Sequence, residues 1–154
     1  TDISALNNSI SNCSILKLNN NEIDDLSPLT NSMPNVVELD LRSNHIRTLD
    51  ALRDSMPNVK DLHLSDNEIY SVEAISGSIN NVRHLCLSYN NITNVSAFAN
   101  KLNCMSKLYL NSNNIESVIS LKNSIDNLYC LNIEKNPIII KQEVMDFNIP
   151  LLHV

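Results

Sequence analysis

Residues 36–58 read VVELDLRSNHIRTLDALRDSMPN, and the same pattern returns every 23 residues along the chain. Its most regular marker is an asparagine, found at Asn21, Asn44, Asn67, Asn90, Asn113 and Asn136. Leucine or isoleucine recurs three residues before each of these asparagines, and isoleucine two residues after. A fixed period in this range predicts a solenoid, in which each repeat packs on its neighbours. A solenoid in turn favours a binding function.

The first half of each repeat has the spacing of a strand. In Leu39-Asp40-Leu41 apolar and polar residues alternate, so the leucines should face inward and Glu38, Asp40 and Arg42 outward. Successive copies are expected side by side at about 4.8 Å, as a six-stranded parallel sheet. The amide of Asn44 can both donate and accept, which suits it to backbone groups left open where the chain leaves the sheet.

The second half has helical spacing, because Leu49, Leu52 and Met56 follow one another at intervals of three and four residues. Met-Pro-Asn at 56–58 should end this short helix and return the chain to the next strand. Residues at one slot of the repeat are predicted to cap the helices, with glutamate the poorest fit. They are Ser4, Ser27, Asp50, Glu73 and Ser96.

The repeat Val-x-x-Leu-x-Leu-x-x-Asn-x-Ile-x-x-Leu-x-x-Leu resembles the leucine-rich repeat family over nearly the whole chain. The 23-residue unit is similar to the short form of intracellular members. The resemblance implies an α/β fold: a right-handed solenoid with a concave parallel β-sheet and short helices on the convex side. It also implies that the asparagines form a ladder along the stack, and that the protein is a non-catalytic binding module.

One domain is expected for residues 1–154, with the repeats at 14–136. Residues 1–13 match the helical half of a repeat without its strand, so they are either an N-terminal cap or part of a longer array. Residues 137–154 follow the Asn136-Pro137 break and resemble the C-terminal cap of intracellular family members. Apolar residues are expected to close the core there: Val144, Phe147, Ile149, Leu151 and Leu152.

Composition narrows the partners. The net charge of −6 disfavours nucleic acid and anionic membranes, and no apolar run approaches the roughly 20 residues of a membrane span. The four cysteines do not form the terminal clusters of extracellular family members, which predicts an intracellular protein. A single glycine among many asparagines and isoleucines is typical of AT-rich genomes, such as those of protists, large viruses and intracellular bacteria.

The outward strand positions vary between copies whose core positions barely change, so this concave surface is the candidate binding site. The tyrosines are expected to supply contact area, and the acidic residues to orient a partner protein with a basic patch. The predicted partner-binding residues are Asp40, Arg42, Asp61, His63, Asp66, His84, Cys86, Tyr89, Lys107 and Tyr109.

A Cys–His pair is also the raw material of a nucleophilic site or a zinc site, and Cys86, His63, His84 and Asp61 should cluster. A shallow sheet offers neither a pocket nor oxyanion donors, so we expect no enzyme activity, no metal and no cofactor. The leading hypothesis is a protein that grips a partner protein on its concave face, as a bacterial effector or as a regulator of another effector enzyme. A structural adaptor in a eukaryotic assembly, of the phosphatase-regulatory or splicing-associated type, is the alternative, and a hydrolase the remote one. The partner's identity and the oligomeric state stay open.

Overall fold

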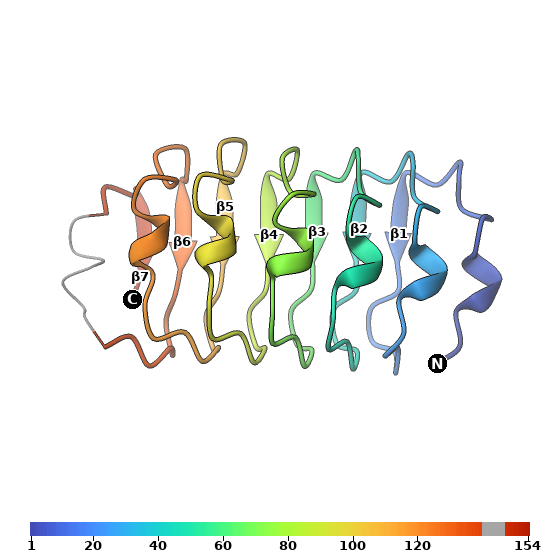
Figure 1. Cartoon of the computed structure of the whole chain (residues 1–154), viewed down its shortest axis with the longest axis horizontal. Coiled ribbons are helices and arrows are strands. Elements are labelled where there is room, and N and C mark those ends of the chain that lie inside the picture. Colours follow the sequence, from blue (N-terminus) through green and yellow to red (C-terminus); the bar gives the residue numbers. More distant parts are fainter. Residues whose placement is uncertain (140–146) are drawn as a thin grey trace.

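The computed structural model describes residues 1–139 and 147–154. Among the described residues, each strand from β1 to β5 is followed by one short helix. The strands pair in chain order into one parallel sheet, and the helices lie along one face of that sheet (Figure 1). The strands are β1 (Ile15–Lys17), β2 (Glu38–Asp40), β3 (Asp61–His63), β4 (His84–Cys86), β5 (Lys107–Tyr109), β6 (Cys130–Asn132) and β7 (Leu151–His153).

The register of the sheet follows the 23-residue period. Leu39 on β2 pairs with Leu16 on β1 and with Leu62 on β3, and the same relation continues to Leu131 on β6. From Leu39 to Leu131 these central leucines are fully buried. The predicted neighbourhood of the strand leucines is therefore confirmed. The physical reason is that a fixed repeat length places equivalent residues one above another, where a parallel ladder pairs them.

The expectation of six strands was wrong, because the described part of the chain contains seven. β7 pairs with β6 through Leu131↔Leu152, and the Ile133 N–H donates to the His153 carbonyl at 2.9 Å. The open edge of β6 carries unpaired backbone groups, and the closing segment satisfies them as a strand. Phe147 and Ile149 are buried as expected of a closing element, and Leu152 packs partly buried against the core. The expectation for Leu151 was wrong, because its side chain points out of the sheet and is exposed, and Val144 lies outside the described residues.

The asparagine ladder is present. Asn90 donates its amide hydrogens towards the carbonyls of Leu64 and Leu87 at 3.0 Å each and Ser88 at 3.2 Å, and its Oδ1 accepts from the Ile69 N–H at 2.9 Å. One side chain thus joins two consecutive repeats. The same cross-repeat pattern is made by Asn44, Asn67, Asn113 and Asn136.

The helices are single 3-10 turns rather than α-helices. They are η1 (Ser4–Leu6), η2 (Ser27–Leu29), η3 (Asp50–Leu52), η4 (Glu73–Ile75), η5 (Ser96–Phe98) and η6 (Ile119–Leu121). Each is held by i→i+3 bonds, which suit such short turns. In four repeats a residue with positive φ, between 53° and 58°, follows shortly after and stops the turn. These residues are Asn8, Asn31, Asp54 and Asn100.

The predicted capping slot was wrong by two residues. Residues such as Ser27 and Ser96 are the first of their 3-10 turns, and none of the turns has a side-chain bond from its N-cap residue. The acceptor lies two positions earlier: Asp25 Oδ1 accepts from the Ser27 N–H at 2.8 Å, and Asn94 Oδ1 from the Ser96 N–H at 2.7 Å. Short polar side chains favour this bond to the backbone two residues on.

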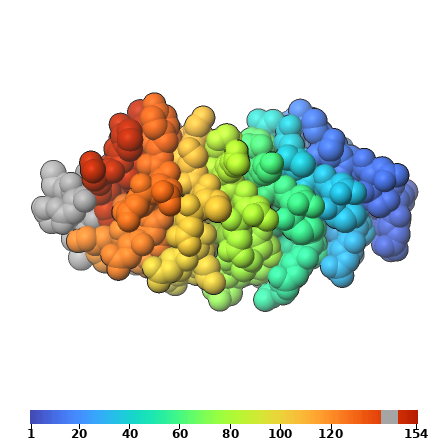
Figure 2. Space-filling model, turned by 90° about the horizontal axis from the view of Figure 1, so that it is seen from above, coloured from blue at the N-terminus to red at the C-terminus, as the bar shows by residue number. Residues whose placement is uncertain are grey.

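One core runs the length of the stack, between the sheet and the turns. Phe98, on η5, is its largest fully buried side chain. At the N-terminal end, η1 packs beside η2. Ile3 and Ile10, on either side of η1 in the sequence, are buried in the core. Viewed from above, the molecule is bowed and slightly hollow along one long side (Figure 2). Within the described residues, no helix has the length and apolar character to cross a bilayer.

Candidate functional site

The candidate surface is the outer face of the sheet, where each strand displays one residue on either side of its buried leucine. Strand register aligns these residues in two columns. Column A contains Ile15, Glu38, Asp61, His84, Lys107, Cys130 and Leu151. Column B contains Lys17, Asp40, His63, Cys86, Tyr109, Asn132 and His153. Neighbours within a column are one strand spacing, about 4.8 Å, apart, so their side chains form one continuous face.

Asp40 is the buried charge of this face. Its side chain is 2% exposed, and its carboxylate accepts from Arg42 Nη2 at 2.6 Å, Nε at 2.9 Å and the Arg42 backbone N–H at 3.1 Å. Burial by itself would raise the pKa of Asp40, but the hydrogen bonds and the charge of Arg42 outweigh burial and hold that pKa below its ordinary value. The Arg42 guanidinium stays half exposed, so this pair presents its cation to a partner.

The carboxylates of Glu38 on β2 and Asp61 on β3 are also paired. Asp61 Oδ1 lies 2.5 Å from His84 Nδ1 on the next strand, and Glu38 Oε1 lies 3.1 Å from Lys17 Nζ. Glu68, in the turn after β3, meets Arg47 at 2.9 Å. Each of these three carboxylates therefore has a basic or imidazole side chain beside it and does not stand as an isolated negative charge.

The middle of the face combines an imidazole, a thiol and a phenol. His63, Cys86 and Tyr109 are consecutive in column B, and all three are half-buried. Burial raises the pKa of the Tyr109 hydroxyl, and its hydrogen bond with Cys130 raises it further. Lys107 stands beside His84 in column A. This region offers contact area and hydrogen-bonding groups with little net charge.

Three of the predicted residues, Arg42, Asp66 and Tyr89, lie beyond the ends of the strands. Tyr89 and Asp66 have positive φ values of 56° and 59°, and the Tyr89 side chain is prominent, at 55% exposure. A left-handed conformation is uncommon for a bulky residue such as tyrosine. Between the turn and the strands, Ser88 Oγ donates to Asn111 Oδ1 at 2.6 Å and links the turns after β4 and β5.

Comparison with known proteins gives the same architecture. A family described as Leucine Rich repeat matches residues 78–99. Internalin C2 of Listeria monocytogenes aligns over 99% of this chain with a TM-score of 0.86 and 21% identity. An internalin (inlF) of the same organism aligns over 99% with a TM-score of 0.72 and 26% identity, and the APL1 leucine-rich repeat domain over 80% with a TM-score of 0.68 and 25% identity. No curated protein matches the chain.

The chain has the fold of a leucine-rich repeat solenoid. It spans 65% of the internalin C2 chain, 50% of the inlF chain and 32% of the APL1 chain. Leucine-rich repeat folds generally mediate protein–protein interaction, and proteins of this kind are typically non-catalytic. The concave face is the broad surface on which such a solenoid varies its side chains.

The solenoid brings seven of the ten predicted binding residues into the two strand columns. Cys86, His84, His63 and Lys107 adjoin one another on β3, β4 and β5, and Tyr109 continues the row. Asp40 and Asp61 lie on the same face, but both are engaged with neighbouring side chains. Arg42, Asp66 and Tyr89 lie beyond the strand ends, on the turns. The roles of all ten in binding a partner remain predictions.

The Cys–His–Asp cluster does not take the arrangement that a nucleophilic site needs. His63 is the register neighbour of Cys86, but Asp61 contacts His84 rather than His63, so the carboxylate does not orient the imidazole beside the thiol. Cys86 Sγ lies 3.7 Å from Ser88 Oγ. Among the described residues, no three His, Cys, Asp or Glu side chains gather in a way that could hold a metal ion.

Sequence reasoning missed part of this face. His153 on β7 continues column B beside Asn132, because the C-terminal segment joins the sheet. The signal was present, since Leu152 is flanked by Leu151 and His153 much as Leu131 is flanked by Cys130 and Asn132. The bond between Ser88 and Asn111 was also missed, because it depends on rotamers that no repeat pattern specifies.

Proposed function

We propose that the solenoid is a non-catalytic module that grips a partner protein on its concave face. The observation that carries the proposal is the row His63, Cys86 and Tyr109, flanked by Lys107 and the exposed Tyr89. Tyrosine provides large contact area for little loss of conformational entropy and is enriched among binding hot spots. These five positions lie near the middle of the sheet, where a bound protein would exclude water around them.

We propose a partner protein whose contacting residues are polar and aromatic. Basic groups of this partner would lie near the N-terminal half of the concave face. The carboxylate of Asp66 is exposed and would meet such a group directly. Asp61 and Asp40 would act through the side chains that they already hold, the imidazole of His84 and the guanidinium of Arg42. Charges placed in this way orient docking and raise the association rate more than they raise affinity.

For the setting, we propose an intracellular protein: a bacterial effector or a regulator of another effector enzyme. The support is the presence of four unpaired cysteines, one of them exposed, since a reducing compartment keeps thiols free. The likeness to internalins supports the fold only. A structural adaptor within a eukaryotic assembly is the alternative, and identification of the captured protein would separate the two settings.

The test is affinity capture with two matched pairs of tyrosine variants, followed by mass spectrometry and a binding titration. Tyr109→Ala should weaken binding by about 2 kcal/mol, seen as faster dissociation. Tyr89→Asn should also weaken binding, and asparagine tolerates the left-handed backbone at that position.

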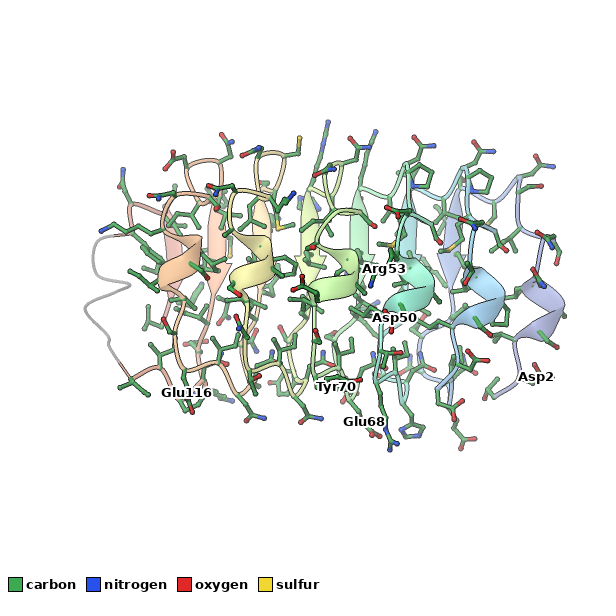
Figure 3. The ribbon with its side chains drawn as sticks, viewed as in Figure 1. Asp2, Asp50, Arg53, Glu68, Tyr70 and Glu116 are labelled. Atoms are coloured by element: carbon green, nitrogen blue, oxygen red, sulfur yellow. The ribbon has the colours of Figure 1, made fainter. Side chains whose placement is uncertain are left out.

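The controls are Tyr129→Ala and Tyr70→Asn, which remove tyrosines that are as exposed as Tyr89 but lie off the concave columns. Tyr70 stands at the edge of the molecule (Figure 3). A partner that survives Tyr109→Ala and Tyr89→Asn but is lost with the control variants would place binding on another surface and contradict the proposal.

A further inference from the structure

The helix side of the solenoid carries two rows of side-chain bonds that tie each repeat to the next. In the serine row, a hydroxyl accepts the backbone N–H of a residue in the preceding repeat. Its members are Asn8 to Ser32, Asn31 to Ser55, Asp54 to Ser78 and Asn100 to Ser124. In the asparagine row, an amide donates to a carbonyl of the preceding repeat. Its members are Asn35 to Ser11, Asn58 to Pro34, Asn81 to Pro57 and Asn127 to Asn103.

Both rows are interrupted at the same junction, between η4 and η5. Lys101 occupies the serine slot, and an ammonium group cannot accept the N–H of Gly77. Cys104 occupies the asparagine slot, opposite the Asn80 carbonyl. The backbone at Lys101 keeps the bond of its serine equivalents, because the Lys101 N–H donates to the Phe98 carbonyl at 3.0 Å, so the interruption comes from side chains alone.

The turn that precedes this junction, after η4, differs in backbone conformation from the equivalent turns after η2, η3 and η5. Asn31, Asp54 and Asn100 have positive φ and point an N–H at a serine, whereas Gly77, at the same slot, does not have positive φ. In the described part of the chain, the Gly77 N–H donates to no protein acceptor. η4 and η5 also pack less closely than the other neighbouring helices of repeats one to six.

The concave side is continuous across the same junction. β4 and β5 pair in full register, and Asn113 donates to the Leu87 carbonyl while accepting the Ile92 N–H. The bonds between these two repeats are therefore complete on the sheet side and missing on the helix side, so the repeats can bend about the sheet side. The neighbouring junctions lack this freedom, because both the serine bond and the asparagine bond are present at each of them.

We infer that the solenoid has a built-in hinge at the seam between η4 and η5, whose axis runs along β4 and β5. Opening of the seam changes the curvature of the concave face between His84 and Lys107. The hinge itself is independent of the function proposed above. Its use, adjusting the curved face to a bound protein, rests on that function.

Amide hydrogen exchange and relaxation dispersion by NMR on the free, intact chain test the hinge. The Gly77 amide should exchange about tenfold faster than the Asp54 amide, after correction for intrinsic rates, because only the latter is held by a cross-repeat bond. Amides flanking the seam should show microsecond-to-millisecond exchange broadening. Equal protection of the two amides, or a seam without such broadening, would overturn the inference.

Two designed variants sharpen this test. Lys101→Ser with Cys104→Asn supplies both missing partners and should protect Gly77 and suppress the broadening. Ser55→Ala with Asn58→Ala removes both bonds between η2 and η3 and should create the same behaviour there. The wild-type comparison needs no substitution, so the hinge stays testable if a variant does not fold. Since no partner is present, failure of the hinge is distinct from failure of the binding proposal.

Discussion

At the scale of single residues, Asn90 shows why asparagine recurs every 23 residues. Its side chain meets three carbonyls and one N–H at a site where it is 7% exposed. Aspartate would bring a charge and no donor, and serine has a single donor. Only a short amide supplies donors and an acceptor at this depth, so the chemistry of the turn selects asparagine.

Asn90→Ala should lower the free energy of unfolding by about 1–3 kcal/mol, because the buried backbone groups of two repeats lose their partner. Chemical denaturation measures this change. Asn21→Ala is the matched control, since Asn21 is exposed and, within the described residues, its side-chain amide donates only to carbonyls of its own turn. Similar losses in the two variants would show that the cross-repeat bonds do not stabilise the fold.

Asp40 should make the solenoid sensitive to acid. Its folded-state pKa is depressed, so it contributes stability at neutral pH, and this contribution is lost as the pH falls below about 4 through the lower folded-state pKa. Asp40→Asn should reduce stability at pH 7 and flatten the acid limb of the curve of unfolding free energy against pH. Asp66→Asn, at an exposed carboxylate, should leave this acid dependence unchanged. If the unfolding free energy of Asp40→Asn still fell steeply at acid pH, Asp40 would not be the source of the acid sensitivity.

At the scale of elements, the 3-10 turns depend on a bond from two residues before their start. Five of the six turns have a side-chain acceptor there, from Asp2, Asp25, Ser71, Asn94 or Ser117. The remaining turn, η3, has Thr48 at that slot and no such bond within the described chain. Since a turn this short has few internal bonds, one outside acceptor adds measurably to its stability, although η3 forms at the same slot without one.

Asn94→Ala should therefore destabilise the solenoid by about 1 kcal/mol, in the range of lost helix caps. Thr48→Ala is the control at the equivalent slot and should be close to neutral. Thermal unfolding of both variants followed by circular dichroism gives the comparison. If Thr48→Ala were the more damaging substitution, the acceptor would not be what positions these turns.

At the scale of the whole molecule, stability depends on how the last repeat is covered. β7 pairs with β6, and its backbone meets Tyr129 and Ile133. Leu152 packs against the end of the core. A repeat array without a covered end exposes apolar surface and an open strand edge.

Removal of residues 150–154 should lower the free energy of unfolding by about 1–3 kcal/mol and increase the tendency to aggregate. Calorimetry and light scattering measure the two effects. Removal of Val154 alone is the control, because that residue is 54% exposed and lies beyond the strand. An unchanged melting temperature after removal of 150–154 would show that β7 does not stabilise the array.

Much of this fold was predictable from the chain alone, because a strict period imposes the same geometry on every copy. The leucine of β4 must stack on the leucines of β3 and β5 once the repeats have equal length, and Asn90 must join them in step. The candidate face was predictable for the same reason: alternation along a strand determines which residues point outward. The ten candidate residues could therefore be named before the structure was known, and their role in binding stays a prediction.

What the period could not determine is how side chains of neighbouring repeats meet. Whether the charge of Asp40 is presented or cancelled depends on the rotamer of Arg42. Whether the Gly77 N–H meets a side-chain acceptor depends on the residue 24 positions later, which is Lys101 where the equivalent Asp54 meets Ser78. The addition of β7 depends on the open edge of β6. The sequence by itself determined the repeating frame, since periodic apolar burial is encoded locally. Only the tertiary structure decided which charges pair, that β7 joins the sheet, and where the rows of cross-repeat bonds are interrupted. These features depend on contacts between neighbouring repeats, and the residues that make those contacts differ from copy to copy.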